Sequence, residues 1–177
     1  SCSNLLKEFV YGLPEINRDS IKKAKLIANP GCYPTAIQLA LIPLLKKKLI
    51  NPISIIADAK SGISGAGKNL ELKLLMSEAE EDFRAYGIAG HRHLPEIEEN
   101  LANIYGDEVK LTFMPHLVPM VRGIHATIYV DCIENFNAKE IFESFYKDEP
   151  FVDIMPADMP PNTKSVRASN FCRISVH

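Results

Sequence analysis

The sequence predicts an α+β domain in which helices cover one face of a mixed or antiparallel sheet. Two segments, 109–113 and 124–132, alternate apolar with polar residues as half-buried strands do, and helical patterns lie on either side of them. No Gly-x-Gly-x-x-Gly follows an early strand, so the sequence shows no dinucleotide-binding half. The 177 residues suit one domain, 1–177, that is long enough to bury a core.

In the first half of the chain, short strands are predicted over 25–28 and 53–59, and a helix over 35–48. Pro43 lies inside this helix and has no backbone N–H, so a kink or an early end is expected there. Residues 60–69 are rich in glycine and are expected to form a loop.

In the second half, composition favours helix over 70–83. A clearer helix covers 94–105, where apolar residues recur at helical spacing. Pro95 suits its first turn and Gly106 its C-terminal end.

The two strongest strand patterns are expected to lie in one sheet. We expect the strands at 109–117 and 121–132 to pair antiparallel, with the helix at 95–105 packed on a face of that sheet. The alternation also places Cys132 on the apolar side of its strand, so its thiol is expected to react slowly.

The last elements are a helix and a strand. Asn137 with Glu140 three residues later is a capping-box pattern at the start of a helix over 137–146. Residues 171–177 alternate again and predict a final strand.

The composition is that of a globular protein with little net charge. The net charge is -2 and the pI is about 6.2, which gives no reason to expect nucleic acid or an acidic membrane surface as a partner. No apolar run reaches the ~18 residues that cross a membrane. The four cysteines have no Cys-x-x-Cys spacing, so we expect reduced thiols and a cytoplasmic location.

Cys32 stands in the local setting of an activated nucleophile. Pro34 can occupy the first turn of the following helix, which places Cys32 at or just before the helix N-terminus. Free N–H groups and the helix dipole stabilise a thiolate at that position, and Gly31 leaves one side of the sulfur open. The alternative is a small apolar residue that merely fills a cap position.

A nucleophilic thiol needs a proton acceptor, and the segment from His91 to Glu96 offers candidates. His91 and His93 form a His-x-His pair, and the Glu96 carboxylate beyond them can orient one imidazole. Two alternatives stay open. The pair could ligate a metal completed by Cys32 or Asp58, or both histidines could be surface residues.

The loop from Gly62 to Lys68 comes close to a phosphate-binding P-loop. The next residue is Asn69, whereas a P-loop needs Ser or Thr to hold magnesium, so a nucleotide triphosphatase is rejected. The loop is still expected to present backbone N–H groups as a nest for phosphate or for the amide edge of a cofactor. A flexible turn is the alternative.

Four segments occur in the order of one known family: NPGCYPTAIQLAL, SGISGAG, HRHLPEIEENL and PHLVPMVRGI. Over nearly the whole chain, from 11 to 176, the sequence resembles the N-acetyl-gamma-glutamyl-phosphate reductases of arginine biosynthesis. The Gly-Cys-Tyr-Pro-Thr signature is specific, since the related aspartate-semialdehyde dehydrogenases usually carry a different sequence around the cysteine.

The resemblance implies the fold of a glyceraldehyde-phosphate-dehydrogenase-like C-terminal domain, which serves substrate binding and dimerisation. The family's N-terminal Rossmann domain and its C-terminal return segment are absent from 1–177, so a fragment without activity is expected. Most of the NADP site belongs to the absent domain. The implied partners are a small acyl phosphate and further copies of the chain, with neither nucleic acid nor membrane.

The resemblance also implies a reaction and the residues that perform it. In the family, the signature cysteine, here Cys32, attacks the acyl phosphate and expels phosphate, and NADPH reduces the resulting thioester to the semialdehyde. His91 or His93 manages protons, and the resemblance does not choose between them. The loop residues expected near the cofactor are Ser61, Gly62, Ser64 and Gly65. Arg122, by its charge, and Glu96 are expected to contact the substrate.

Other functions remain open at this point. The substrate could be the aminoadipyl phosphate of lysine biosynthesis, one methylene longer, or that of an aspartate-semialdehyde dehydrogenase relative. From other classes, Cys32 with His91 or His93 could serve a thiol- or zinc-dependent hydrolase, or the fold could be a binding module without catalysis.

Overall fold

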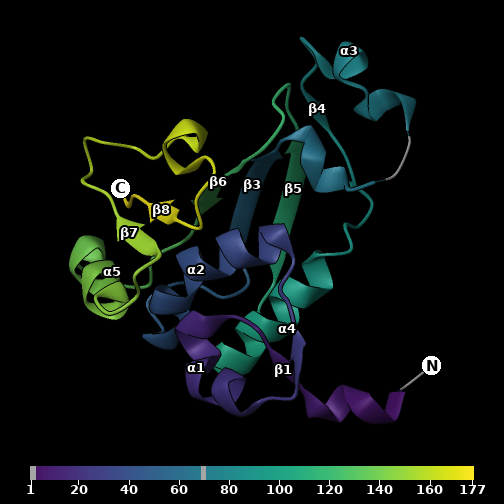
Figure 1. Cartoon of the computed structure of the whole chain (residues 1–177). Coiled ribbons are helices and arrows are strands. Elements are labelled where there is room, and N and C mark those ends of the chain that lie inside the picture. The colour runs from purple at the N-terminus through teal and green to yellow at the C-terminus, as the bar shows by residue number, and fades with distance from the viewer. Residues whose placement is uncertain (1–2, 69–70) are drawn as a thin grey trace.

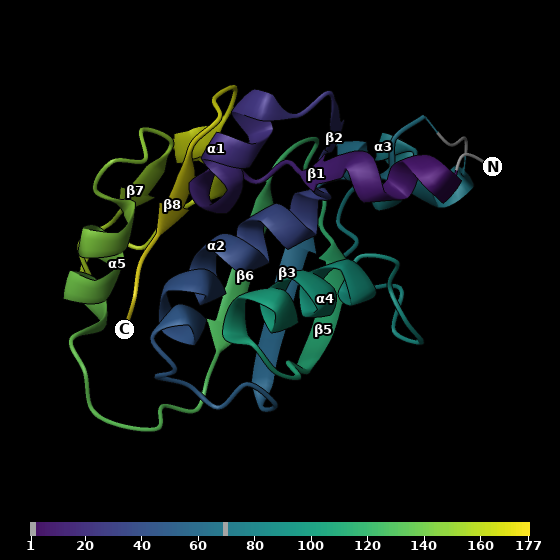
Figure 2. The ribbon, with the colours of Figure 1, turned by 90° about the horizontal axis from the view of Figure 1, so that it is seen from below.

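A four-stranded mixed sheet covered by two helices forms the centre of the molecule (Figure 1). The computed structural model describes residues 3–68 and 71–177. In space the strands follow the order β4-β5-β3-β6. Their bounds are Ile55–Ser61 for β3, Arg84–Ala85 for β4, Leu111–Leu117 for β5 and Ile124–Tyr129 for β6. Helices α2, Cys32–Lys46, and α4, Leu94–Tyr105, lie side by side over one face (Figure 2). The α+β prediction with a mixed sheet covered on one face is confirmed.

The predicted direct pairing of 109–117 with 121–132 is wrong, because β3 lies between them. β3 pairs parallel with β5 and antiparallel with β6. The connection from β5 to β6 crosses the end of β3, where the N–H groups of Gly62 and Ile63 donate to the carbonyls of Gly123 and Met120 at 3.0 Å each. These bonds hold the connection over β3 and prevent a tight hairpin between β5 and β6.

Helix α2 is almost wholly buried. An early end was expected at Pro43, but the helix continues beyond this residue. Because proline has no N–H, the carbonyl of Leu39 four residues earlier lacks its helical partner. The hydroxyl of Tyr146 donates to that carbonyl at 2.5 Å. Burial raises the pKa of Tyr146, so the phenol keeps the proton that it donates. A distant side chain therefore satisfies the group that the proline leaves free, and the helix continues to Lys46.

Two small parallel strand pairs flank the sheet. At the N-terminal side, β1 (Phe9–Tyr11) pairs with β2 (Leu26–Ala28), a 3-10 helix η1 (Ser3–Glu8) precedes them, and α1 (Pro14–Lys23) connects them. At the C-terminal side, β7 (Val152–Ile154) pairs with β8 (Cys172–Ile174). The strands predicted at 25–28 and 171–177 are therefore present as β2 and β8.

Helix termini follow the sequence signals closely. Gly106 ends α4 with a left-handed φ of 89°, and Pro95 lies in the first turn of the same helix. Asn137 caps α5, Ala138–Tyr146, and its side chain accepts a hydrogen bond from the N–H of Glu140 at 3.2 Å.

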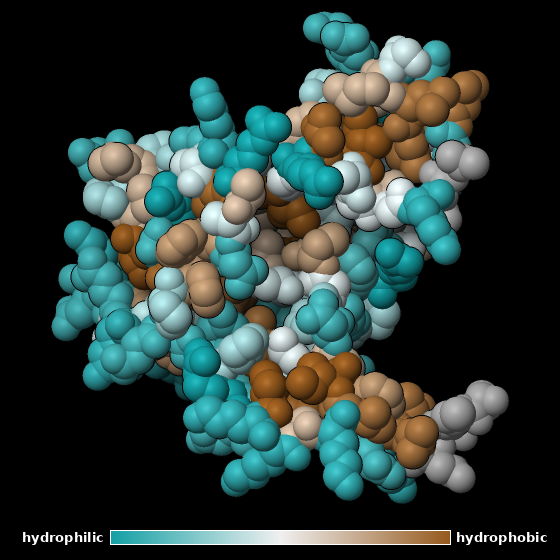
Figure 3. Space-filling view, viewed as in Figure 1, coloured by the Kyte–Doolittle hydropathy of each residue, from teal (hydrophilic) through white to brown (hydrophobic). Residues whose placement is uncertain are grey.

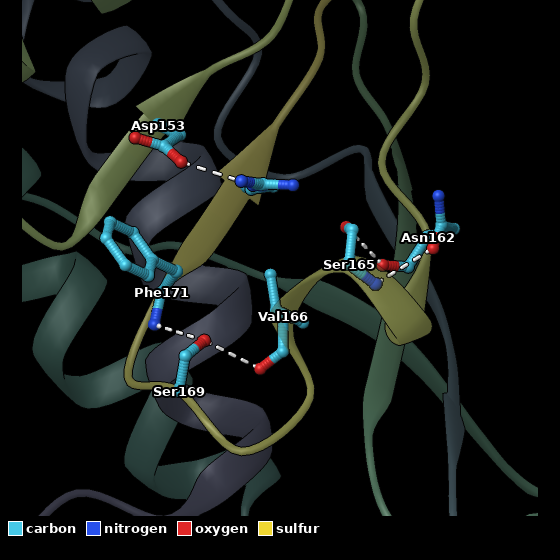
Figure 4. Close-up of polar contacts among 7 residues, drawn as sticks. Asp153, Asn162, Ser165, Val166, Ser169 and Phe171 are labelled. Carbon is cyan, nitrogen blue, oxygen red and sulfur yellow. Dashed lines mark hydrogen bonds and ion pairs between the residues drawn. The ribbon is translucent and has the colours of Figure 1, made fainter.

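The segment linking β7 to β8 is fastened by its own polar side chains (Figure 4). It contains the 3-10 turn η4, Thr163–Val166, which Asn162 caps by accepting from the N–H of Ser165 at 3.0 Å. Ser169 donates from its hydroxyl to the carbonyl of Val166 at 2.7 Å. The two strands themselves are joined across the pair by an ion pair between Arg173 and Asp153 at 3.1 Å.

The long helix expected over 70–83 is absent from the described part of that segment. It contains a 3-10 turn η3, Leu72–Leu74, and a single helical turn α3, Met76–Ala79, and Glu81 has a positive φ of 62°. Composition favours helix here, but most helical stability comes from packing an apolar face. Among the described residues of 71–83, Ala79 alone is buried. Apolar surface gathers at the upper right in Figure 3, where Figure 1 shows α3. The exposed large apolar side chains of this segment are Leu72, Leu75, Met76 and Phe83.

Cys132 is exposed, so its predicted place on the apolar side of a strand is wrong. β6 ends at Tyr129, and the alternation that fixes the side-chain direction does not extend three residues beyond it. Cys132 makes only an isolated bridge to Ile50. Cys2 lies outside the described residues.

No helix in 3–68 or 71–177 is both long enough and apolar enough to span a membrane.

Replacing Leu101 by alanine is expected to lower the free energy of unfolding by about 2–5 kcal/mol. Leu101 is fully buried on α4, so the change removes apolar contacts and leaves a cavity. Urea unfolding followed by circular dichroism measures the loss. Asn103→Ala, an exposed position on the same helix, is the matched control and should change stability by less than about 0.5 kcal/mol. Equal effects of the two changes would contradict the packing of α4 described above.

Candidate active site

Cys32 is the first residue of α2 and is exposed. Gly31 is the N-cap in an extended conformation, and its carbonyl accepts the first helical hydrogen bond from the N–H of Thr35 at 3.0 Å. The Thr35 hydroxyl donates to the same carbonyl at 2.9 Å. The predicted place of Cys32 at the start of a helix is confirmed.

His93 lies directly against the turn that carries the cysteine. A Cβ placed on Gly31 would lie 2.7 Å from Nε2 of His93 and 2.9 Å from its Cδ2. Only a residue without a side chain therefore allows the imidazole to come this close. Gly31, which precedes Cys32, therefore packs closely against the ring of His93, the N-cap of α4.

His91 has a different environment from His93. Its Nδ1 accepts a hydrogen bond from the backbone N–H of His93 at 3.1 Å, so a neutral His91 carries its proton on Nε2. Its ring packs edge-on against Tyr33, Tyr86 and Phe113 with centroids 5.4–5.7 Å apart. The two histidines therefore have different roles. The ring of His93 faces the turn before Cys32, and His91 accepts a hydrogen bond from the backbone of His93.

Both imidazoles are biased toward the neutral form. Burial lowers the pKa of His91, and the charges of His93 and Arg92 lower it further. Burial also lowers the pKa of His93, an effect that the Glu96 carboxylate opposes and the Arg92 charge reinforces. A neutral imidazole is the form that can accept a proton from a thiol.

Two tyrosines near Cys32, Tyr33 and Tyr86, belong to the site although the sequence analysis predicted no role for them. Tyr86 donates from its hydroxyl to that of Tyr33 at 3.1 Å, and Tyr33 donates to the carbonyl of His116 at 3.4 Å. Burial raises the pKa of both phenols, and a negative charge on Cys32 adds to this. The pair therefore remains protonated beside the thiol. Tyr86 has no sequence signal, because only the folding of 84–87 against β5 brings it here.

The glycine-rich loop is not the nest of free N–H groups that we expected. The N–H groups of Gly62, Ile63 and Ser64 donate to the carbonyls of 120–123, and that of Gly65 donates back to Gly62. A Cβ on Gly62 would lie 2.9 Å from backbone atoms of Met120 and Arg122, so the close backbone approach explains the glycine.

The side chains around this loop differ in what they offer a ligand. Ser61 is only 4% exposed, and its hydroxyl donates to the carbonyl of Gly62 at 3.0 Å. Ser64 and Gly65 are exposed, as is Arg122 on the segment that the loop packs against. Asn69 lies outside the described residues.

Glu96 and Asp58 both have partners other than the catalytic candidates. Oε1 of Glu96 accepts from the N–H of Gly31 at 2.9 Å. Asp58 lies on β3 and pairs with Lys60 at 2.7 Å, and its Oδ1 lies 3.1 Å from Nδ1 of His116. Within the described ranges, no three of His, Cys, Asp and Glu lie close enough to hold a metal ion, so the geometry gives no support to a metal site on Cys32 or Asp58.

The stability of the chain is expected to fall as the pH drops from about 7 to about 5. An unfolded histidine titrates near ~6.5, and the folded pKa values of His91 and His93 are lower, so the unfolded chain binds more protons in this range. Stability therefore rises with pH. Urea unfolding at several pH values should give a shallower dependence for His93→Gln than for the unchanged protein.

The matched control for this measurement is His177→Gln, because His177 is exposed at the end of the chain. It should keep the dependence of the unchanged protein. A His93→Gln variant that loses stability with falling pH as steeply as the unchanged protein would contradict the burial of a neutral imidazole.

Known proteins resemble this chain in sequence and in fold. N-acetyl-gamma-glutamyl-phosphate reductase of Laribacter hongkongensis is 57% identical over 98% of this chain, which spans 51% of that protein. The chain thus covers about half the length of the curated relatives that it matches.

Two solved structures share the fold at low identity. Aspartate semialdehyde dehydrogenase II of Vibrio cholerae matches 96% of this chain and 58% of its own, with a TM-score of 0.71 at 15% identity. The aspartate semialdehyde dehydrogenase of Candida albicans, solved with NADP, matches 90% of this chain and 54% of its own, with a TM-score of 0.61 at 12% identity. The family model "Semialdehyde dehydrogenase, dimerisation domain" matches residues 32–177. The chain therefore belongs to the semialdehyde dehydrogenase dimerisation-domain family.

Proposed function

We propose that this chain carries the nucleophile and the proton-transferring histidine of an NADP-dependent N-acetyl-gamma-glutamyl-phosphate reductase. The observation that carries the proposal is the exposed Cys32 at the start of α2, with the His93 ring against the glycine before it. The name and high identity of the Laribacter relative support the substrate, an acyl phosphate of N-acetylglutamate.

The first half of the reaction needs only groups of this chain and the substrate. The Cys32 thiol gives its proton to the neutral His93, and the sulfur attacks the acyl carbon. A carbon–sulfur bond forms, the carbon–oxygen bond to phosphate breaks, and phosphate leaves with both electrons of that bond. The product is a thioester on Cys32.

The second half reduces that thioester. NADPH, when bound, supplies a hydride to the acyl carbon. The proton on His93 goes to the oxygen and gives a thiohemiacetal on Cys32. Loss of the hydroxyl proton back to His93 then breaks the carbon–sulfur bond, releases the semialdehyde and returns the thiolate.

The loop around Ser64 fits only part of a nicotinamide cofactor. Its N–H groups from 62 to 65 are already bonded, so it has no cradle for the cofactor's phosphates. The exposed Ser64 and Gly65 are the residues that would lie against NADP, and the buried Ser61 and Gly62 would support them from behind. Arg122 is exposed on the segment beside this loop, and its guanidinium would supply a positive charge for an anionic group of the substrate.

We further propose that the uncovered face of the sheet pairs with a second copy of this chain. Burial alternates along β3, with Ile55, Ala57 and Ala59 buried under the helices and Ile56 facing away. The strand register places Tyr129 beside Ile56 on this outer face. Ile56 is 45% exposed and Tyr129 57%, so association on this face would cover two large hydrophobic side chains. The dimerisation-domain family supports the same kind of partner.

The thioester step predicts that an acyl phosphate labels Cys32 and spares the other described thiols. Incubation with acetyl phosphate, followed by site-resolved mass spectrometry, should show an acetyl group on Cys32 that hydroxylamine removes. Cys132 controls for exposure, because it is exposed but stands at an isolated bridge and not at a helix start. Cys172 controls for burial, which raises its pKa to about 11. His93→Gln should slow labelling by about 100-fold.

Iodoacetamide gives a second, substrate-free test of the same thiol. Cys32 should alkylate faster than Cys132 at neutral pH, and both faster than the half-buried Cys172, whose pKa is raised to about 11. Equal acetylation of Cys32 and Cys132, or none on Cys32 while it still reacts with iodoacetamide, would rule out the proposed acyl transfer for this chain.

The dimer proposal predicts that Ile56→Asp weakens self-association by about tenfold or more, because a buried interface position would receive a charge. Sedimentation velocity over a range of protein concentrations measures the change. Ile53→Asp is the control: Ile53 is 60% exposed but precedes β3. If both variants associate like the unchanged protein, the outer face of the sheet is not the interface.

A further inference from the structure

Two hydrogen-bond donors from distant parts of the chain converge on one oxygen of Glu96. Oε1 accepts from the N–H of Gly31 at 2.9 Å and from the hydroxyl of Tyr11 at 2.8 Å. Gln38, which is fully buried, donates from Nε2 to the Tyr11 oxygen at 2.8 Å. The chain of contacts therefore runs from Gln38 through Tyr11 and Glu96 to the residue that precedes Cys32.

We propose that Glu96 is a positioning residue that fixes the turn of Cys32 relative to the helix of His93. This inference rests on the proposed function, in which those two residues act together. Glu96 stands three residues after His93, one turn along α4, so the carboxylate and the imidazole share one rigid element. By holding Gly31, the carboxylate sets the distance between that element and the start of α2.

The direction of each bond supports a carboxylate at this place. Gly31 can only donate through its N–H, and Gln38 donates to the Tyr11 oxygen, so the Tyr11 proton points toward Glu96. Burial raises the pKa of Tyr11, and the phenol stays protonated as a donor. An oxygen of Glu96 with two lone pairs accepts both donors at once.

Besides accepting hydrogen bonds, Glu96 changes the pKa of His93 through its charge. The negative charge raises the pKa of His93 against the burial that lowers it. The other charge that acts on this imidazole is Arg92, which lowers the pKa. Glu96 thus tunes the histidine through space and holds the cysteine's turn through a hydrogen bond.

The experiment separates these two effects with Glu96→Gln, Glu96→Ala and Tyr11→Phe. Glutamine keeps an oxygen that can accept both bonds but has no charge. We therefore expect Glu96→Gln to lower the pKa of His93 in an NMR titration. Iodoacetamide should alkylate Cys32 of this variant at a rate within about twofold of that of the unchanged protein. Glu96→Ala loses the acceptor as well, and its Cys32 alkylation should fall by about tenfold, since a displacement of about 1 Å can cost up to about 100-fold.

Tyr11→Phe removes one donor and leaves both the charge and the Gly31 bond. Tyr11→Phe should change the rate of Cys32 alkylation less than Glu96→Ala does. It should leave the pKa of His93 unchanged, because the Glu96 charge is kept. Glu99→Gln, an exposed acid on the same helix, is the control for a general change of charge and should match the unchanged protein in both measurements.

The proposal is overturned if Glu96→Gln leaves the His93 titration unchanged, or if Cys32 in Glu96→Ala reacts at the unchanged rate. If Glu96→Ala does not fold, Glu96→Gln and Tyr11→Phe still decide the outcome, because the charge effect must appear in the first and not in the second. Acetylation of unchanged Cys32 by acetyl phosphate is measured in parallel. Its absence would refute the proposed function, while the His93 titration and the alkylation rates would still test the positioning role.

Discussion

The burial of α2 is the constraint on which the rest of the molecule depends. The helix contacts β6 and α4 and buries side chains that point to different sides, including Leu39, Ile42 and Leu44. Its one backbone defect, at Pro43, is repaired by Tyr146, which ties the C-terminal part of the chain to the middle of the same helix. A helix held on all sides has a fixed N-terminus, and Cys32 is the residue found there.

Local rules were sufficient where a signal lies within one turn of the residue it describes. The ends of α4 and the Asn137 cap of α5 follow from nearby residues, and so does the placement of Cys32 at a helix start. Local rules failed where a distant partner decides. Nothing near Pro43 indicates that Tyr146 will satisfy its helix, and nothing in 109–132 indicates that β3 will enter between the two strands.

The site shows the same division between residue identity and residue arrangement. The sequence identifies Cys32, His91, His93 and Glu96 as the chemically capable residues. Their separate environments come from three contacts that spacing cannot reveal: His93 against Gly31, His91 Nδ1 on the N–H of His93, and Glu96 on the N–H of Gly31. The prediction for the loop at 62–65 was wrong for a related reason. The N–H groups of 62–64 bond to carbonyls of 120–123, about 60 positions later in the chain.

The pairing of β1 with β2 has a mechanical consequence for the nucleophile. Tyr11 ends β1 and lies opposite Ala28, which ends β2. Two residues, Asn29 and Pro30, connect Ala28 to Gly31. Gly31 and Tyr11 both donate hydrogen bonds to the Glu96 carboxylate. The strand pair, the turn and the carboxylate therefore form a closed ring of contacts. In a closed ring, a displacement of one member is opposed from two directions at once. The turn of Cys32 can shift only if the strand pair opens or the carboxylate releases a donor, so thermal motion of the sulfur is limited by the ladder between β1 and β2.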